Sequence, residues 1–428
     1  MADEPARQAL KRARRVVIKI GSKTLAADQT FYRRLADEVG PLQSSRRSFV
    51  IVSSGAVALG MVKLGLRARP KDMAWIQASA AAGQSVLMRR YEEHFGAAGM
   101  AVAQVLLTHA DLADRARANN ARAALAALLE AGVVPVINEN DTVAVEEIRF
   151  GDNDQLASMV VPLVDADLLL LLSDVPGLLD GQKRVPLVRD IEREARPLAG
   201  ASVSGVGTGG MASKVEAARR ATFAGANVVV ADAREPGIVS AVCRGEDVGT
   251  LFVATPRRLS ARRHWVAFTL RPRGALVLDG GAAEAVTGRN KSLLAVGVTG
   301  VRGDFRAGDA VTLVDPAGRE LGRGLCRYPA SEACRYAGRR HDDDGEDIVF
   351  VHRDDLVVFT PNAATSPEAL AKNRAESAPP TKEMGSANRG LSAAARRPAP
   401  KTPRRYRRSA GRRRPGPSYR RDGRASGR

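Results

Sequence analysis

The sequence predicts an α/β protein with a mostly parallel sheet sandwiched between helices, followed by a small β-rich domain and a disordered basic tail. Short, nearly continuous apolar runs alternate with helical patterns through about residue 255. This alternation is typical of strands that are buried on both faces of a parallel sheet. From about residue 273 the pattern changes to short strands separated by glycines, and Arg, Pro, Gly and Ser dominate the last 68 residues.

Six apolar runs in the first 256 residues have the length of strands. They are RVVIKI (15–20), SFVIVS (48–53), MAVAQVLL (100–107), VVPVIN (133–138), DLLLLLS (167–173) and NVVVAD (227–232). Helical patterns lie between them, near residues 30–43, 72–95, 111–132 and 211–225. We therefore expect an α/β domain (1–256), a charged linker (257–272), a β-rich domain (273–360) and a basic tail (361–428).

The positive charge of the chain is concentrated in its tail. The formal net charge is +19, of which residues 361–428 carry +14. These residues cannot bury enough apolar surface to offset the entropy of ordering, so we expect the tail to be disordered. Its arginines could bind nucleic-acid phosphates, although a solvated extension is the simpler interpretation. Both interpretations remain open.

Composition also indicates the cellular compartment. No apolar run is long enough to span a bilayer, and the N-terminus lacks the apolar core of a signal peptide. The cysteines (Cys243, Cys326, Cys334) form no C-x-x-C motif and no disulfide framework. We expect a cytoplasmic protein without membrane contact.

The segment GVGTGGMASK (205–214) predicts a phosphate site of an unusual kind. No strand leads into its glycines, as a dinucleotide fingerprint requires, and no Lys-Ser or Lys-Thr directly follows the last glycine, as in a P-loop. A protein-kinase reading also fails, because HRDD (352–355) lacks its catalytic-loop Asn. Glycines nevertheless permit close backbone approach, a helix start favours an anion, and Lys214 adds a positive charge.

Four other segments place polar residues at the ends of predicted strands. They are IKIGS with Lys19 and Gly21, IVSSG with Ser53 and Ser54, INEND with GDND (137–141 and 151–154), and LLSD with Ser173 and Asp174. Each has a structural alternative, since Lys19 could lie on an edge strand and the others could cap helices or form turns. Ligands of open α/β sheets bind at the carboxyl ends of strands. Together the segments therefore predict a site for anions at that edge.

The segments VVIKIGSKTL, IVSSGAVALG, PVINENDTVA, FGDNDQLAS, LLLLSDVPGL and GVGTGGMASKVEAA occur in this order. As a set they resemble the glutamate 5-kinases of the amino-acid kinase superfamily, over about residues 14–360. The β-rich domain resembles a PUA domain. The resemblance implies ATP-dependent phosphorylation of the γ-carboxylate of L-glutamate to L-glutamyl 5-phosphate, the first step of proline biosynthesis. It also implies Mg²⁺, proline as a feedback inhibitor, and a homo-oligomer, either a dimer or a tetramer.

The resemblance implies roles for residues at matching positions. Lys19 and Lys214 are implied to bind the ATP phosphates, and Asp154 to hold both lysines in place, so these three form the implied catalytic set. The implied substrate-binding residues are Ser54, Asp141 and Asn153. The implied ATP-binding residues are Lys19, Gly21, Ser173, Asp174, Thr208, Gly209, Gly210, Met211, Ala212, Ser213 and Lys214. No metal-ligating side chain is assigned.

Within this assignment, Asp141 suits the substrate ammonium, while Ser54 and the nearby Asn and Gly amides suit the α-carboxylate. Two departures from the family pattern stand out. The stretch between Asp174 and Gly205 is shorter than usual, which leaves the adenine contacts open, and the basic tail has no counterpart. A related kinase acting on N-acetylglutamate or aspartate is an alternative that fits the β-rich domain poorly. RNA binding by the PUA-like domain or the tail is a second alternative.

Overall fold

The computed structural model describes residues 4–28, 30–144, 153–200, 210–255, 258–289, 291–342 and 344–359. The chain divides into two compact units, residues 1–371 and 372–428, and all described residues belong to the first. The predicted disordered tail lies outside the described residues. So do Thr208 and Gly209, together with Gly205 and Gly207 of the glycine-rich segment.

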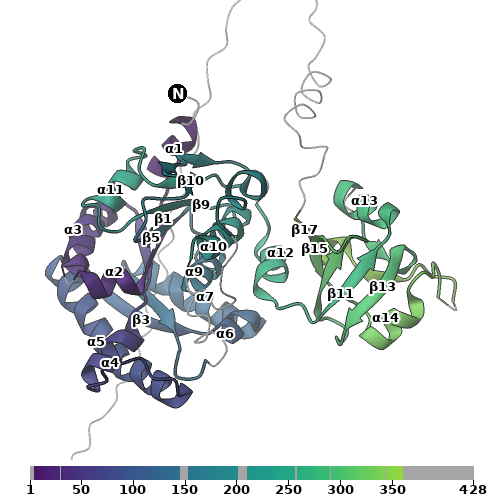
Figure 1. Cartoon of the computed structure of the whole chain (residues 1–428), viewed down its shortest axis with the longest axis horizontal. Helices are drawn as coiled ribbons and strands as arrows, with labels where there is room; N and C mark the ends of the chain where they lie inside the picture. Colours follow the sequence, from purple (N-terminus) through teal and green to yellow (C-terminus); the bar gives the residue numbers. More distant parts are fainter. Residues whose placement is uncertain are drawn as a thin grey trace, which may run out of the picture. The chain divides into compact units, whose positions relative to one another are not determined.

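The first domain is built around an eight-stranded sheet with the order β3-β4-β2-β1-β5-β9-β10-β8 (Figure 1). Neighbouring strands are parallel except for β9 and β10. The predicted fold class is confirmed. The strands are β1 (Arg15–Ile20), β2 (Ser48–Val52), β3 (Val102–Leu107), β4 (Val134–Glu139), β5 (Leu168–Ser173), β8 (Leu187–Val188), β9 (Asn227–Asp232) and β10 (Thr250–Phe252).

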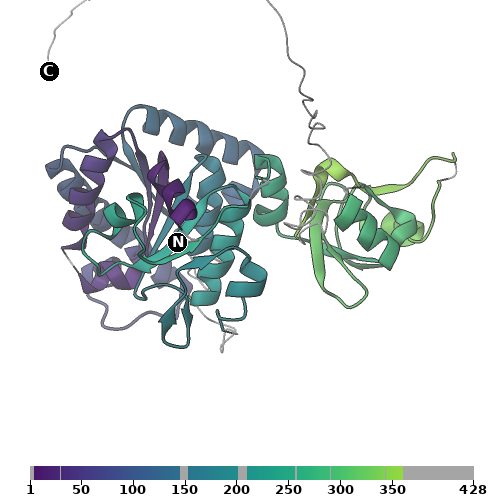
Figure 2. The ribbon, with the colours of Figure 1, turned by 90° about the horizontal axis from the view of Figure 1, so that it is seen from above.

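Helices cover both faces of this sheet (Figures 1 and 2). One face packs against α3 (Phe31–Ser44), α5 (Met73–Ala97) and α11 (Ile238–Cys243). The other face packs against α7 (Arg115–Glu130), α9 (Asn153–Leu163) and α10 (Met211–Phe223). The remaining helices of this domain are α1 (Glu4–Lys11), α2 (Ser22–Ala27), α4 (Ala56–Lys63), α6 (His109–Ala113) and the short π-helix η1 (Ile191–Ala195).

Strand β1 shows how the alternation of side chains determines the position of a functional residue. Val16, Ile18 and Ile20 belong to the core on the α3 and α5 side, whereas Val17 belongs to the core on the α9 and α10 side. Because successive side chains of a strand point to opposite faces, Lys19 faces the same side as Val17. It therefore faces α9 and α10.

One predicted helix is wrong in its boundaries. Residues 111–132 form two helices, α6 and α7, rather than one. Asp114 has an extended backbone and its side chain accepts a hydrogen bond from the Arg117 amide, so it begins a new helix. Thr108 and Asp111 form a capping box at the start of α6.

The second domain contains a five-stranded sheet with the order β13-β11-β14-β15-β17. The pairing of β11 with β14 is parallel, and the other pairings are antiparallel. Leu276, Leu313 and Phe350 lie in its separate core. The larger elements are β11 (Gly274–Leu278), α13 (Gly280–Arg289), β13 (Val298–Gly303), β14 (Ala310–Val314), β15 (Glu320–Leu325), α14 (Ala330–Tyr336), β16 (Val349–Val351) and β17 (Leu356–Val358).

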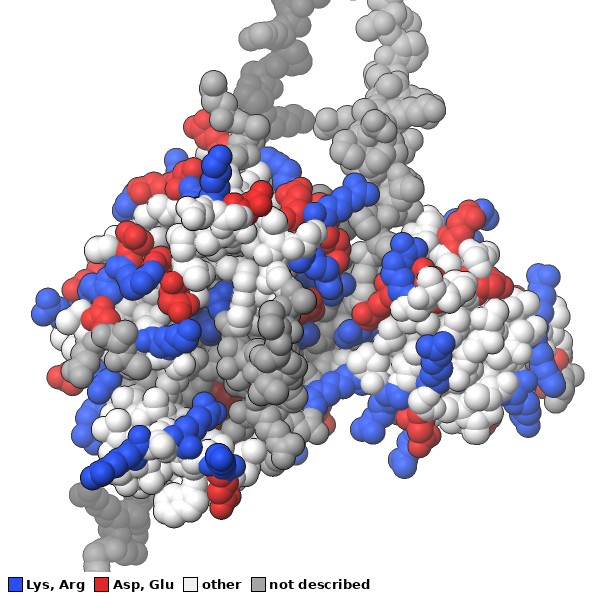
Figure 3. All heavy atoms as spheres, in the orientation of Figure 1, with Lys and Arg blue, Asp and Glu red and all other residues white. Residues whose placement is uncertain are grey.

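Two short helices, α12 (Ala261–His264) and the π-helix η2 (Trp265–Thr269), lie within the segment predicted as a linker. On the face shown in Figure 3, Lys and Arg side chains are interspersed with Asp and Glu side chains over the described residues. This distribution agrees with the modest charge of the chain outside its tail. It gives no support from this face to a nucleic-acid surface on the described residues.

Helices α4 and α5 cross at two glycines. A Cβ atom at Gly60 would overlap the carbonyl oxygen of Ser79, and a Cβ atom at Gly83 would overlap that of Ala56. The two backbones are therefore in direct contact, which only glycine permits. Because α4 directly follows the end of β2, this contact fixes the backbone beside the carboxyl edge of the sheet.

We predict that Gly60→Ala or Gly83→Ala lowers the free energy of unfolding by about 1–3 kcal/mol or more, because the helices must separate. Urea denaturation measures the change. Gly96→Ala is the matched control, since Gly96 lies in α5 with no atom near its missing Cβ. That control should stabilise by about 0.5–1 kcal/mol. An equal change in the free energy of unfolding at all three positions would contradict the direct backbone contact between α4 and α5.

Candidate active site

Two lysines that are far apart in the sequence meet at one carboxylate. The Lys19 Nζ lies 2.5 Å from Oδ1 of Asp154, and the Lys214 Nζ lies 3.1 Å from Oδ2. Lys19 is 6% exposed, Lys214 is 5% exposed and Asp154 is 0% exposed. The structure thus brings together the three residues implied as catalytic, and it excludes the edge-strand alternative for Lys19, because β1 pairs with both β2 and β5.

The three residues come from three elements that end or begin at the carboxyl edge of the sheet. Lys19 is the penultimate residue of β1, Asp154 lies in the first turn of α9, and Lys214 lies in the first turn of α10. The chain runs from β1 to β2 on one side, and returns to β5 on the other side of β1. This reversal of strand order creates a crevice where open α/β sheets bind ligands.

The electrostatic balance at Asp154 favours its charged form. Burial raises the pKa of this carboxyl, but the attraction and hydrogen bonds of Lys19 and Lys214 outweigh burial and hold the pKa below its usual value. The group is therefore an anion between two cations. It leaves one net positive charge, which suits a phosphate ligand.

A cavity of about 320 Å³ lies close to this triad and includes all three residues implied to bind substrate. Asn153, which directly precedes Asp154, lies on its wall, so the cavity and the triad share the first turn of α9. Its lining residues are Ser22, Ser54, Gly55, Ala56, Val57, Ala58, Met61, Arg69, Asn138, Glu139, Asp141 and Asn153.

The side-chain amide of Asn153 has a fixed orientation. Its Nδ2 lies 2.5 Å from the carbonyl oxygen of Ser53, 2.9 Å from Oγ of Ser54 and 3.1 Å from Oδ1 of Asn138. A carbonyl oxygen only accepts hydrogen bonds, so the nitrogen must face Ser53. Through its side chain, Asn153 can therefore offer a ligand its amide oxygen but not its nitrogen. The expectation that Ser54 and the nearby Asn and Gly amides meet the α-carboxylate stays a prediction.

A chain of amides supports this orientation. Asn138 donates from Nδ2 to Oε1 of Gln84 at 2.9 Å, so Gln84 in α5 fixes Asn138, which in turn fixes Asn153. The Oγ of Ser53 lies 2.9 Å from the hydroxyl oxygen of the buried Tyr91. Sequence reasoning found Asn138 within INEND but missed Gln84, because a glutamine inside a helix carries no motif.

Asp141 is a perturbed carboxyl in this cavity. Burial raises its pKa to about 6, and the nearby Arg69 guanidinium opposes this rise. Asp141 is thus charged at neutral pH and suits an ammonium group. Sequence reasoning missed Arg69, which lies among other charged residues between α4 and α5 with nothing to distinguish it.

The residues implied to bind nucleotide lie at the same edge as far as the structure describes them. Ser173 ends β5 and its Oγ lies 3.2 Å from Oδ1 of Asp174, whose carboxylate also pairs with Lys23 at 3.2 Å. Gly21 precedes α2, and Gly210 to Lys214 form the start of α10. Thr208 and Gly209 lie outside the described residues.

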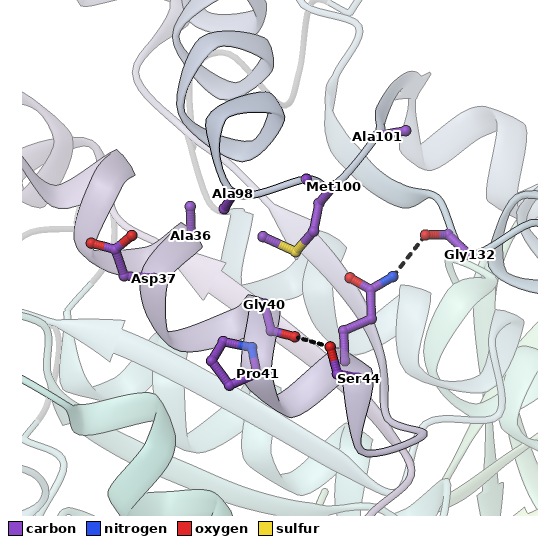
Figure 4. A pocket seen from close by; sticks show the side chains of 11 residues that line it. Ala36, Asp37, Gly40, Pro41, Ser44, Ala98, Met100, Ala101 and Gly132 are labelled. Carbon is purple, nitrogen blue, oxygen red and sulfur yellow. Dashed lines mark hydrogen bonds between the residues drawn. The ribbon is translucent and has the colours of Figure 1, made fainter.

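Another hollow, of about 560 Å³, lies at the opposite edge of the sheet (Figure 4). Ala101 and Gly132, which precede β3 and β4, line it together with residues of α3. Two of its polar side chains bind backbone carbonyls of the same hollow, since Gln43 donates to the carbonyl of Gly132 at 2.7 Å and Ser44 to that of Gly40 at 3.1 Å. It is therefore a poor candidate for the anion site.

Among the described residues, no group of three or more His, Cys, Asp or Glu could hold a metal ion. No helix among them has both the length and the apolar character needed to cross a membrane.

Comparison with known proteins identifies the family. The model of the amino acid kinase family matches residues 14–232. The chain belongs to the amino acid kinase family. The PUA domain model matches residues 274–344, within the second domain of this amino acid kinase.

Relatives resemble this amino acid kinase over most of its length. The glutamate 5-kinase of Myxococcus xanthus is 49% identical over 370 residues, which cover 82% of this chain and 98% of the relative. The glutamate 5-kinase of Moorella thermoacetica is 45% identical over 381 residues, 84% of this chain and 100% of the relative. The glutamate 5-kinase of Frankia casuarinae is 46% identical over 365 residues, which cover 82% of this chain and 98% of the relative.

We predict that Asp154→Asn lowers the free energy of unfolding by about 3–5 kcal/mol, because two buried ammonium groups lose their anionic partner. Chemical denaturation measures this change. Asp165→Asn is the control, since that exposed carboxylate pairs with Arg258 at 2.6 Å at the surface, and its loss should cost about 1 kcal/mol or less. An Asp154→Asn protein as stable as the control would show that the lysines do not depend on this charge.

We also predict that the KM for an amino-acid substrate rises as the pH falls through 6. Below that value the Asp141 carboxyl becomes protonated and can no longer attract an ammonium group. Well below pH 6 the KM should rise about tenfold for each pH unit, since the titration of Asp141 involves one proton. Steady-state kinetics between pH 5 and 8 measure it. In Asp141→Asn the KM should be high and nearly independent of pH, and a retained slope would assign the titration to another group.

Proposed function

We propose that this chain is an ATP-dependent glutamate 5-kinase, which phosphorylates the γ-carboxylate of L-glutamate to L-glutamyl 5-phosphate in the first step of proline biosynthesis. The convergence of Lys19 and Lys214 on Asp154, next to a cavity that is suited to an amino acid, is the observation that carries the proposal. Relatives that bear this name over nearly their whole length support it.

The chemistry requires charge neutralisation rather than a general base. A glutamate carboxylate is already ionised at neutral pH, so the barrier arises from bringing it close to a triphosphate. Lys19, Lys214 and the positive end of the α10 dipole would take up negative charge on the transferred phosphoryl group. Holding both reactants in line contributes about 7–11 kcal/mol. Asp154 would act by positioning the lysines.

The acceptor cavity suits the α-amino end of glutamate. Its ammonium would lie between the Asp141 carboxylate and the amide oxygen of Asn153, the only part of that amide free to accept. Ser54, whose hydroxyl lies 2.9 Å from Nδ2 of Asn153, would contact the substrate from the other side. The γ-carboxylate would then extend toward the lysines.

Mg²⁺ is proposed to arrive with ATP. The described residues supply no cluster of acidic ligands, and both oxygens of Asp154 contact lysines. Mg²⁺ commonly binds through phosphates and one or two carboxylates, and Asp174 is the half-exposed carboxylate at this edge. When bound, the ion would neutralise phosphate charge.

Other properties implied by the family remain proposals. They are a homo-oligomer (dimer or tetramer), feedback inhibition by proline, a cytoplasmic location, and RNA binding by the PUA-like domain or the tail. Filter retention of RNA at two salt concentrations, with and without residues 361–428, tests the last of these. Binding by tail arginines should weaken steeply with salt.

The decisive assay compares acceptors. We expect ATP turnover with L-glutamate and much slower turnover with N-acetylglutamate, aspartate or uridylate, both for the full chain and for a chain lacking residues 361–428. A preference for N-acetylglutamate or aspartate would indicate a related amino acid kinase instead. Absence of turnover with every acceptor would contradict enzymatic function altogether.

We predict that Lys19→Ala and Lys214→Ala each lower kcat by about 10²–10³-fold, because each removes one donor to the transferred phosphoryl group. The fold should be retained, since the other lysine still pairs with Asp154. Lys23→Ala is the control, as its exposed ammonium pairs with Asp174 at the surface, and we expect a smaller effect. Near-normal turnover in either of the first two variants would remove the proposed roles.

A further inference from the structure

None of the implied substrate-binding side chains of the acceptor cavity carries a positive charge. L-Glutamate carries two carboxylates, and if the γ-carboxylate extends toward Lys19 and Lys214, the α-carboxylate remains in the cavity. The carboxylates of Glu139 and Asp141 line that cavity. An unpaired anion beside two further carboxylates would be strongly disfavoured.

Arg69 is the one Lys or Arg among the described residues that line this cavity. It lies in the segment between α4 and α5, which is held at its far end by Asp72, whose side chain caps α5 by accepting from the Ala74 amide at 2.9 Å. Within the described part of the chain, no salt bridge to the Arg69 guanidinium is found. Arg69 is an exposed residue, so its long side chain can turn toward a ligand.

Arg69 and Asp141 share one cavity, as the two binding groups for an α-amino acid must. The ammonium and the α-carboxylate are attached to the same carbon, so their binding groups must lie next to each other. Arg69 and Asp141 line the same small cavity and lie close enough for the guanidinium to influence the carboxyl electrostatically. Arginine also binds carboxylates with two parallel hydrogen bonds, which lysine cannot do.

From these contacts we infer that Arg69 binds the α-carboxylate of the acceptor and so selects substrates that carry one. This inference rests on the proposed function, because it assumes that glutamate occupies the cavity. It assigns Arg69 as a specificity-determining residue, separate from the lysines that act on the phosphoryl group.

The test uses pairs of substrates that differ only at the α-carboxyl group. L-Isoglutamine keeps the γ-carboxylate and the ammonium but has a neutral α-carboxamide, and 4-aminobutyrate lacks the group. In Arg69→Met, kcat/KM for L-glutamate should fall about 10- to 100-fold, mainly through KM, while the values for the two analogues change less than about twofold. Arg69→Lys should retain part of the preference.

Arg67→Met is the matched control, since Arg67 lies in the same segment but does not line the cavity, and it should leave all values unchanged. Dissociation constants of L-glutamate and L-isoglutamine by calorimetry give the same comparison without turnover. An equal loss for both ligands in Arg69→Met would show an indirect effect, and no loss would place the α-carboxylate elsewhere. Either result overturns the inference. Failure of wild-type turnover with glutamate would instead contradict the proposed function.

Discussion

Asp154 holds two ammonium groups within one buried site, and the arrangement of the first domain depends on this contact. Each ion loses several kcal/mol of hydration on burial, which the mutual attraction repays only if the geometry is close. The contact joins β1, α9 and α10, and β1 is separated from both helices by more than 100 residues along the chain. A site with one carboxylate and two ammonium groups is also incompletely neutralised, so it is suited to a polyanion that supplies the missing negative charge.

In the proposed reaction, the first turn of α9 would connect the acceptor site with the phosphate site. Asn153 faces the acceptor cavity and its neighbour Asp154 contacts the lysines. Consecutive residues of an α-helix point about 100° apart, so one turn can serve two adjoining sites. Any movement of this turn would change the acceptor and phosphate sites together. The amide network through Asn138 and Gln84 restrains this turn from the cavity side.

The sheet was predictable from the sequence because buried parallel strands have a simple signal, and all six predicted runs overlap strands. The position of Lys19 was predictable in part: its apolar neighbours indicated burial, but only pairing with β2 and β5 shows a central strand. Asp154 could be assigned only through family resemblance, since an acidic residue at a helix start is equally a cap. The orientation of the Asn153 amide depends on a carbonyl from another strand, which no local pattern reveals. Arg69 is hidden for the same reason, because the polar residues that line the cavity with it come from distant parts of the chain, including β4, the turn after it and α9.

The wall of the acceptor cavity is set by backbone rather than by side-chain contacts. Gly55 has a φ of 94°, so the chain turns sharply from the end of β2 into α4, and Gly60 then packs directly on α5. Such contacts leave little room for adjustment, because a backbone cannot change rotamer. The segment after α4 is exposed by contrast, and Arg69 extends from it. In the proposed site, the rigid wall would limit the length of an acceptor whose carboxylate reaches the lysines. Arg69 would recognise the substituents of the acceptor's α-carbon separately. Discrimination between glutamate and shorter or blocked amino acids would then arise from two independent constraints within a single cavity.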